Sequence, residues 1–316
     1  GSAMTDATAS PAASLVKDDA PRSLWRDVWD QFRLHRGAML GLWVLGALLI
    51  FVIVGPFVWT LEPIKVNPNT AEMFKSRNLP ASWEHPLGTE QVGRDIMARL
   101  MLGGKVSLAV GFVAMAVAVF LGTLIGLLSG YFRRLDGALM RLTDLFLSLP
   151  LLPLILVLTF LYGPYLKEIF GPNLGTFFIL IIAIGLTSWM HVARIVRGQV
   201  LAVKEREFVL AARSIGTPSS RIILRHILPN VLAPVMVAAA LGVANAIITE
   251  SVVSFLGQGF QSDFSTWGSM LNSAYYNQTY PMQMVWPGLA ISLTVLSVNY
   301  VGDGLRDALD PRIRGR

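Results

Sequence analysis

Six long apolar segments constrain the fold of this chain more than any other feature of its sequence. A helix needs about 20 mostly apolar residues to cross a bilayer. Several segments carry internal Gly or Pro, which membrane helices tolerate better than soluble ones. The sequence therefore predicts an all-α integral membrane protein with about six spans. The expected spans are Ala38–Leu61, Val106–Gly130, Asp144–Tyr162, Leu174–Ala193, Val231–Leu256 and Val285–Val301.

Composition agrees with a membrane domain. Of the 316 residues, 53% are hydrophobic and only 15% are charged, whereas about 25% are charged in an average soluble domain. The net charge of +6 comes from basic residues that lie between the apolar segments, so membrane topology explains it better than nucleic-acid binding. The chain has no cysteine, and its four histidines show no metal-ligand spacing. No disulfide and no metal site are expected.

The distribution of Lys and Arg predicts the orientation in the membrane. If the N-terminus is inside, the inner segments hold 19 of the 26 basic residues and the outer segments hold 7. Six of these 7 lie in the long 62–105 loop, where they count for less than in a short loop. This excess of basic residues in the inner segments predicts that both ends of the chain lie in the cytoplasm.

The N-terminal region divides into two parts. Residues 1–3, ahead of Met4, are expected to be a tag-cleavage scar, and the polar residues 4–21 are expected to be disordered. Residues 22–36 then place apolar side chains at helical spacing among arginines. This pattern predicts an amphipathic helix that lies in the membrane interface, or one that packs on the protein's own cytoplasmic face.

The inner loop at 204–229 predicts two helices joined by a sharp bend. The first helix should end at Gly216, as helices often end at glycine. Thr217 can cap the second helix, with Pro218 in its first position. That helix should end near Pro229, after which Asn230 can cap the fifth span. Small residues at the bend would let another protein approach, although an ordinary connecting loop is the alternative.

This loop resembles the signature loop of ABC importer permeases, in which Glu-Ala-Ala is followed by three residues, Gly, nine residues and Ile-x-Leu-Pro. Ala211-Ala212, Gly216 and His226-Ile227-Leu228-Pro229 keep that spacing, but Leu210 replaces the glutamate. Glu207, one turn earlier, is a possible substitute. Histidine at position 226 resembles the peptide-importer branch. The resemblance implies a loop that couples to an ATPase through Glu207, Ala211, Ala212, Arg213, Gly216, Thr217, His226, Leu228 and Pro229.

Three further stretches resemble the second permease of dipeptide and oligopeptide importers. They are His85–Asp95, Glu250–Gly257 with Trp267-Gly268 downstream, and Asn299–Arg312. Together with the inner loop they cover the chain from about residue 22 to its end. The resemblance implies a type I ABC importer permease fold. The expected divisions are a scar and disordered segment (1–21), a cytoplasmic amphipathic helix (22–36), a first transmembrane helix (37–61), a periplasmic loop (62–105), a core permease domain (106–305) containing the coupling loop (204–229), and a cytoplasmic tail (306–316).

Three smaller groups are candidate sites, each with a structural alternative. Glu250, with Ser251 and Ser254, lies in an apolar span, where a carboxylate should face the interior or a water-filled path. The second group could contact a binding protein or partner permease, or could simply cap the next helix. It comprises Gly88, Thr89, Gly93, Arg94 and Asp95. The third group, Asp303, Arg306 and Asp307 with Asp310, could form a salt-bridged cytoplasmic cap or pack against the ATPase.

The resemblance implies an ATP-driven peptide importer in the bacterial inner membrane. This chain and a second permease would form the path, while two ATPase subunits would bind ATP and Mg²⁺, and a binding protein would deliver substrate. The chain has no phosphate-binding loop and no catalytic motif of a hydrolase, so no cofactor of its own is expected. The alternatives are import of a nickel chelate, opine or glutathione, a channel, and a membrane-embedded enzyme using Glu250 and His191.

Overall fold

The computed structural model describes residues 24–261 and 264–310, and these residues form helices and loops without a β-strand. The prediction of disorder for residues 1–21 lies outside the described residues. The elements are α1 (Leu24–Leu34), α2 (Arg36–Ile53), α3 (Gly55–Val58), α4 (Thr70–Ser76), α5 (Ile96–Tyr131), α6 (Arg133–Ser148), α7 (Leu151–Phe170), α8 (Pro172–Leu186), α9 (Trp189–Val203), α10 (Glu207–Ser214), α11 (Ser219–Arg221), the π-helix η2 (Ile222–Ile227), α12 (Leu228–Phe255), α13 (Trp267–Tyr275) and α14 (Met282–Leu309).

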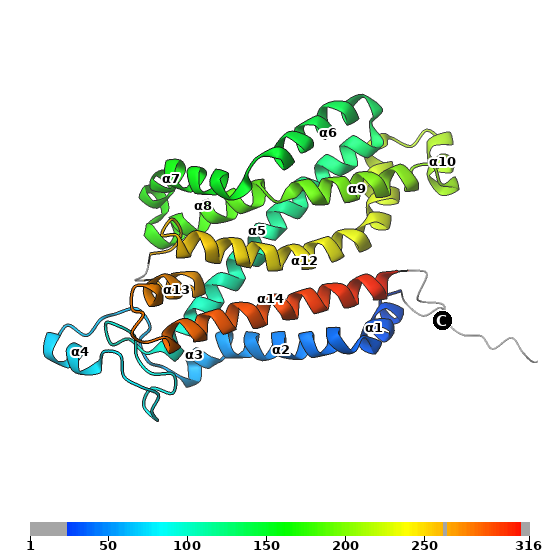
Figure 1. Cartoon of the computed structure of the whole chain (residues 1–316). Coiled ribbons are helices and arrows are strands. Elements are labelled where there is room, and N and C mark those ends of the chain that lie inside the picture. The colour runs from blue at the N-terminus through cyan, green and yellow to red at the C-terminus, as the bar shows by residue number, and fades with distance from the viewer. Residues whose placement is uncertain (1–23, 262–263, 311–316) are drawn as a thin grey trace, which may run out of the picture.

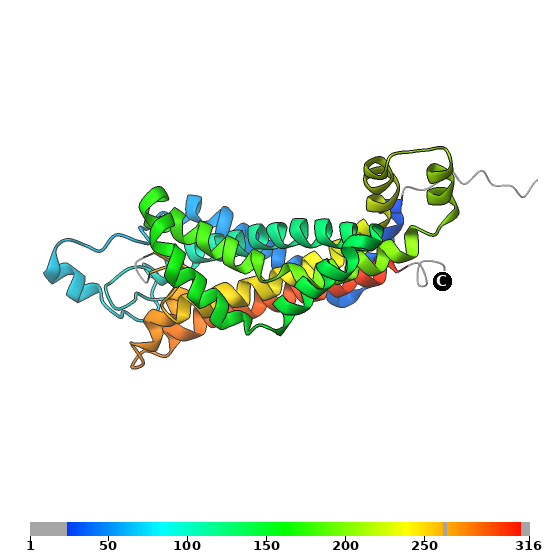
Figure 2. The same ribbon diagram turned by 90° about the horizontal axis from the view of Figure 1, so that it is seen from above.

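The long helices form an elongated bundle. Helix α14 lies beside both α2 and α12, and α5 crosses behind them (Figure 1). Helices α1 and α10 and the end of α14 lie at one end of this bundle, whereas α4 and α13 lie at the other (Figure 1). Figure 2 shows the same separation from above, with the α10 region and the α4 region projecting at opposite ends.

Helices α5 and α9 pack at close range because glycines on α5 face α9. Gly122, Gly126 and Gly130 recur every four residues, so they share one helix face. A Cβ atom at Gly126 would lie 2.6 Å from the Cβ of Val196, and one at Gly130 would lie 2.7 Å from the Cβ of Val200. Small residues at this spacing let membrane helices approach closely without a strong hydrophobic driving force.

The prediction of about six spans is confirmed. Five single helical stretches are long and apolar enough to cross a membrane, and α8 with α9, which are bent by 42° relative to each other, make a sixth when the pair is counted as one span. Several spans are longer than predicted, because α5 starts at Ile96 and α14 continues to Leu309. The loop expected at 62–105 therefore ends ten residues early, and Arg306 lies inside the last helix rather than after it.

The third and fourth spans differ most from the prediction. The third begins at Leu151 rather than Asp144, because Pro150 separates it from the amphipathic helix α6. Pro150 is the N-cap of α7, where the missing N–H group removes no helical hydrogen bond. In the fourth, α8 ends at Leu186 and α9 continues to Val203, ten residues beyond the predicted end.

Helix α1 packs on the protein's own surface, which is one of the two alternatives predicted for the N-terminal amphipathic helix. Val28 and Phe32 are buried against Ala38 and Ala308, so one face packs on the ends of α2 and α14. Trp25 and Trp29 remain exposed on the other side. The side of α1 that does not pack on the protein therefore exposes two tryptophan side chains.

Candidate functional site

The first candidate site is the helical hairpin, which we define as residues 204–229. Helix α10 ends in a Schellman motif, because the Thr217 N–H bonds to the Ala212 carbonyl and the Gly216 N–H bonds to the Arg213 carbonyl. Gly216 has a φ of +80°, which only glycine adopts without strain. A Cβ atom there would meet no atom within 4 Å, so backbone conformation and not space requires the glycine. The predicted helix stop is confirmed.

The second half of the hairpin corrects the sequence-based expectation. Pro218, not Thr217, occupies the N-cap of α11, and no side chain caps that helix. Pro229 does not end a helix, because η2 runs directly into α12. In the wider π turn, the Leu228 N–H donates to the Ile223 carbonyl, five residues back. Pro229 lies in the first turn of α12, where the N–H group that proline lacks is not needed for a helical hydrogen bond. Asn230 donates to the His226 carbonyl instead of capping the span.

The hairpin has one anchored face and one open face. Val209 and Ala212 of α10 join the main core, as do the three buried isoleucines of η2. On the open face, Ile215 is 83% exposed at the tip. Other exposed residues of the hairpin include Glu207, Phe208, Leu210, Ala211, Arg213, Gly216 and Leu224. The hairpin therefore presents apolar side chains beside charges, which is a suitable surface for another protein.

The second candidate site is the long loop, which we define as residues 59–95. Asp95 is the N-cap of α5 and accepts from the Ala98 N–H at 2.9 Å. Its carboxylate also accepts from Trp59 Nε1 at 2.7 Å, and His85 Nδ1 lies 2.8 Å from its other oxygen. Arg94 makes a two-pronged contact with the carboxylate of Glu90. These groups fold the loop into a fixed shape.

Other contacts dock the long loop onto the start of α14. The Asn78 side-chain oxygen accepts hydrogen bonds from both Asn277 and Gln283, each at 2.9 Å. Gly88 and Gly93 have positive φ and lie so close to neighbouring chain segments that a side chain would clash. Thr89, Arg94 and Asp95 are buried. The structure thus favours the capping role over direct contact with another protein for this group.

Glu250 lies in a buried polar cluster between α5, α12 and the segment before α13. Its carboxyl group is fully buried, and Ser254 Oγ donates to Oε1 at 2.8 Å. The hydroxyls of Ser107 and Thr266 lie beside the same carboxyl group. Within the described residues Oε2 accepts no hydrogen bond. Ser251 and Ser254 are buried as well. The three side chains therefore contact neighbouring helices and are not accessible at the surface of this subunit.

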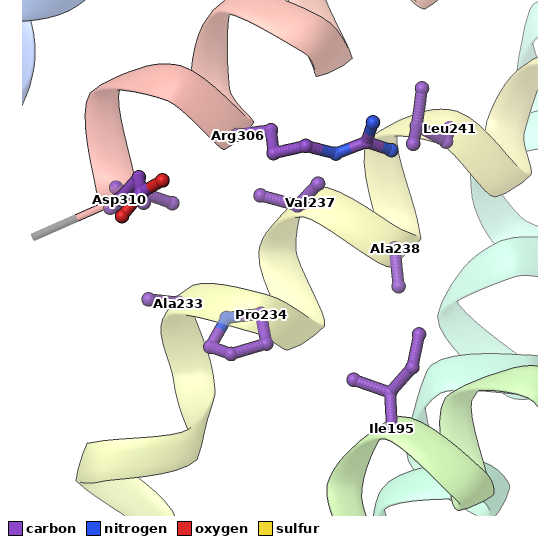
Figure 3. Close-up of a pocket in the computed structure, with 9 residues that line it drawn as sticks. Ile195, Ala233, Pro234, Val237, Ala238, Leu241, Arg306 and Asp310 are labelled. Carbon is purple, nitrogen blue, oxygen red and sulfur yellow. The ribbon is translucent and has the colours of Figure 1, made fainter. Parts of the chain in front are cut away.

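A groove of about 350 Å³ lies between α9, the first half of α12 and the end of α14 (Figure 3). Its lining is mostly apolar, with Ile195 of α9 on one side and Arg306 of α14 on the other. The Arg306 side chain extends from α14 toward Leu241 (Figure 3). Its ion pair with Asp303 is long, at 3.9 Å, and exposed. The Asp307 carboxylate lies 3.5 Å from His35 Nε2. Arg306 and Asp303 of the predicted charged cap therefore pair within α14, whereas Asp307 pairs with a residue near the start of α2.

Two groups of polar residues were not among the sequence-based candidates. Asp136 of α6 accepts from Arg197 of α9 at 2.6 and 2.9 Å and from Ser129 of α5 at 2.6 Å. Asn245 is exposed near the middle of α12. A lone amide in an apolar segment was a visible signal for Asn245, whereas the Asp136–Arg197 pair joins positions 61 residues apart that only the fold brings together.

Comparison with known proteins covers nearly the whole chain. Residues 118–315 match the family described as binding-protein-dependent transport system inner membrane component, and residues 23–80 match the N-terminal transmembrane domain of oligopeptide transport permease C. A dipeptide transport system permease protein of Bacillus subtilis is 37% identical, with 92% of this chain and 87% of the relative covered. An oligopeptide transport system permease protein of Haemophilus influenzae is 38% identical, with 93% and 90% covered.

A solved structure of the MetNI methionine ABC transporter contains a chain of similar fold, with a TM-score of 0.54 and 19% identity. The match covers 68% of this chain and 98% of that chain. At this identity the likeness concerns the fold alone. The five or six apolar crossings, the hairpin at one end of the bundle and the sequence matches lead to one conclusion: this multi-pass inner-membrane protein belongs to the family of binding-protein-dependent transport system inner membrane components, the permease subunits of ABC importers.

Proposed function

We propose that this chain is one of two permease subunits of an ATP-driven importer of short peptides. The observation that carries the proposal is the match over more than 90% of the chain to relatives named for dipeptide and oligopeptide transport. The second permease completes the path, a binding protein delivers the peptide, and two separate ATPase subunits bind ATP and Mg²⁺. The sequence of this chain contains no Gly-x-x-x-x-Gly-Lys-Ser/Thr motif, which is the usual phosphate-binding loop of an ATPase.

The hairpin transmits ATPase movement to the path. Its open face carries the exposed tip residue Ile215, while η2 continues without interruption into α12. A rigid connection of this kind moves a membrane helix whenever the tip is displaced. Helix α12 also forms one wall of the groove in Figure 3, so a displacement of the hairpin would change the shape of this groove.

The hairpin end of the bundle faces the cytoplasm in this proposal. Single cysteines introduced at Thr217 and Gln278 test the orientation cleanly, because this chain contains no cysteine. A membrane-impermeant thiol reagent added outside intact cells should label Gln278→Cys alone. Labelling of Thr217→Cys from outside would reverse the topology.

Uptake by a reconstituted complex tests the substrate. Liposomes containing this chain, its partner permease and the ATPase subunits should accumulate trialanine when the binding protein is outside and ATP is inside. The isolated chain should hydrolyse no ATP. Accumulation of glutathione or a nickel chelate in place of trialanine would overturn the peptide assignment while leaving the family unchanged.

A further inference from the structure

The hairpin is connected to the membrane helices at both of its ends. Its second half continues through η2 into α12. Its first half follows α9, which ends at Val203, and the three residues 204–206 separate α9 from α10. Hydrogen bonds from the Lys204 and Arg206 N–H groups to carbonyls of α9 tighten this short connection. A displacement of the hairpin therefore reaches α9 as well as α12.

Helix α6 packs beside α9 with little buried surface of its own. Of the sixteen residues that the structure describes in α6, Thr143 alone is buried. A helix without a wide buried apolar face gains little from hydrophobic packing. Its aromatic contact with α9 is the edge-to-face pair of Phe146 and Trp189, whose ring centres lie 5.5 Å apart. The position of α6 relative to α9 must therefore depend on other contacts.

Two ion pairs between α6 and α9 supply those contacts, and we call them the clasp. Arg197 donates to both carboxylate oxygens of Asp136, at 2.6 and 2.9 Å, and Arg194 pairs with Asp144. The two arginines are three residues apart and share one face of α9. Ser129 of α5 donates to Asp136 as well, at 2.6 Å. The clasp thus joins three helices near the hairpin end of the bundle.

The clasp lies between the hairpin and the third span. Arg197 is six residues before the end of α9, which corresponds to about 9 Å along the helix. Helix α6 runs from the hairpin end of the bundle toward α7 (Figure 1), and only residues 149 and 150 separate these two helices. Movement of α9 can reach α7 through α6 if the clasp holds the two helices together.

We propose that the clasp transmits hairpin movement from α9 to α6 and on to the third span, so that Arg194 and Arg197 are positioning residues for transport. This inference rests on the proposed function. The two bonds of an arginine fork fix the orientation of the paired carboxylate as well as its distance. The hairpin then moves two spans at once, α12 through the continuous helix and α7 through the clasp. Because partly exposed ion pairs add little to stability, loss of the clasp changes coupling more than folding.

The first test removes the fork and measures coupling. In liposomes containing the whole complex, Arg197→Gln should lower the number of trialanine molecules imported per ATP hydrolysed about fivefold, within the range of energies that couple contacting residues. ATP hydrolysis and co-purification of the partner subunits should remain near normal. The matched control is Arg141→Gln, because Arg141 is exposed on α6 and makes no ion pair with the described residues. This control should import as many molecules per ATP as the wild type.

The second test exchanges the charges of the exposed pair. Asp144→Arg places two arginines opposite each other and should lower the same ratio about fivefold. Adding Arg194→Asp restores an ion pair of reversed direction, and the ratio should return to within about twofold of the wild-type value. Both side chains are more than half exposed, so the exchange buries no charge. Failure of the double variant to recover would overturn the proposal.

The third test measures whether α6 follows the hairpin. Leu142 of α6 and Ser220 of α11 are exposed, and this chain contains no cysteine, so two introduced cysteines can carry spin labels in a complex with cysteine-free partner subunits. The distance between the labels should be the same without nucleotide and with ATP bound. It should differ between these states when Arg194→Gln and Arg197→Gln are combined. A distance that changes in the otherwise wild-type complex would show that α6 does not follow the hairpin.

The outcomes separate this inference from the proposed function. Failure of the wild-type complex to accumulate trialanine would refute peptide import, whereas the distance test needs only the ATPase subunits and would still decide whether the clasp transmits movement. An unchanged import ratio in Arg197→Gln would overturn the proposal. Loss of partner subunits from this variant in proportion to the lost uptake would show that the clasp only stabilises the fold, and the proposal would be wrong.

Discussion

The long loop and the helical hairpin lie at opposite ends of the bundle and are built in different ways (Figure 2). Buried polar groups hold the long loop: Asp95 alone joins Trp59, His85 and the start of α5. The hairpin is held by apolar contacts of Val209 and the isoleucines of η2, and its bend depends on Gly216. A polar network fixes one geometry, whereas an apolar contact surface tolerates small displacements. This difference suits a fixed loop at one end and a moving hairpin at the other.

The largest expected effect is in the long loop. Asp95→Ala removes the acceptor of three hydrogen-bond donors, and the free energy of unfolding should fall by about 3 kcal/mol. Thermal unfolding of the detergent-solubilised protein measures this loss. The control is Asp303→Ala, whose carboxylate is half exposed and has a long ion pair; its effect should be below about 0.5 kcal/mol. Equal unfolding temperatures for both variants would show that the network does not stabilise the loop.

A smaller effect on stability is expected at the bend of the hairpin. Gly216→Val places a side chain at φ +80° in otherwise open space, which should cost about 1 kcal/mol. Expression and membrane insertion should remain nearly normal, but ATPase association should weaken and most peptide uptake should be lost. Gly46→Val is the matched control, because a Cβ atom there also meets nothing within 4 Å and the backbone is helical. Normal uptake by Gly216→Val would remove the hairpin from the coupling mechanism.

The smallest effect concerns a polar link near the hairpin end. Hydrogen bonds from Arg197 lower the pKa of Asp136 from 3.8 to about 2. A carboxyl group with a lowered pKa in the folded protein stabilises it at neutral pH, and this contribution disappears as the pH falls from about 4 to about 2. The unfolding temperature of the wild type should therefore fall more steeply over this range than that of Asp136→Asn. Parallel pH profiles would show that the pair contributes nothing measurable.

Local chemistry determined what the sequence predicted correctly. Apolar length fixes the number of crossings, because backbone groups in lipid must bond within a helix. Gly216 marks the bend, since the Schellman motif needs a residue with positive φ. Asp95 was predicted near a helix start and is the N-cap of α5. Each of these features depends on residues within one or two helical turns.

Only the tertiary structure decided which side chains meet across the fold. Pro229 should end a helix by local rules, but the π turn of η2 lets the chain continue into α12. Glu250 could have faced a path or the interior, and packing against α5 and the segment before α13 buries it. Asn245 remains open because no described helix covers its side of α12. Burial and exposure of a helix face depend on neighbours distant in sequence, which the periodicity of a single segment does not specify.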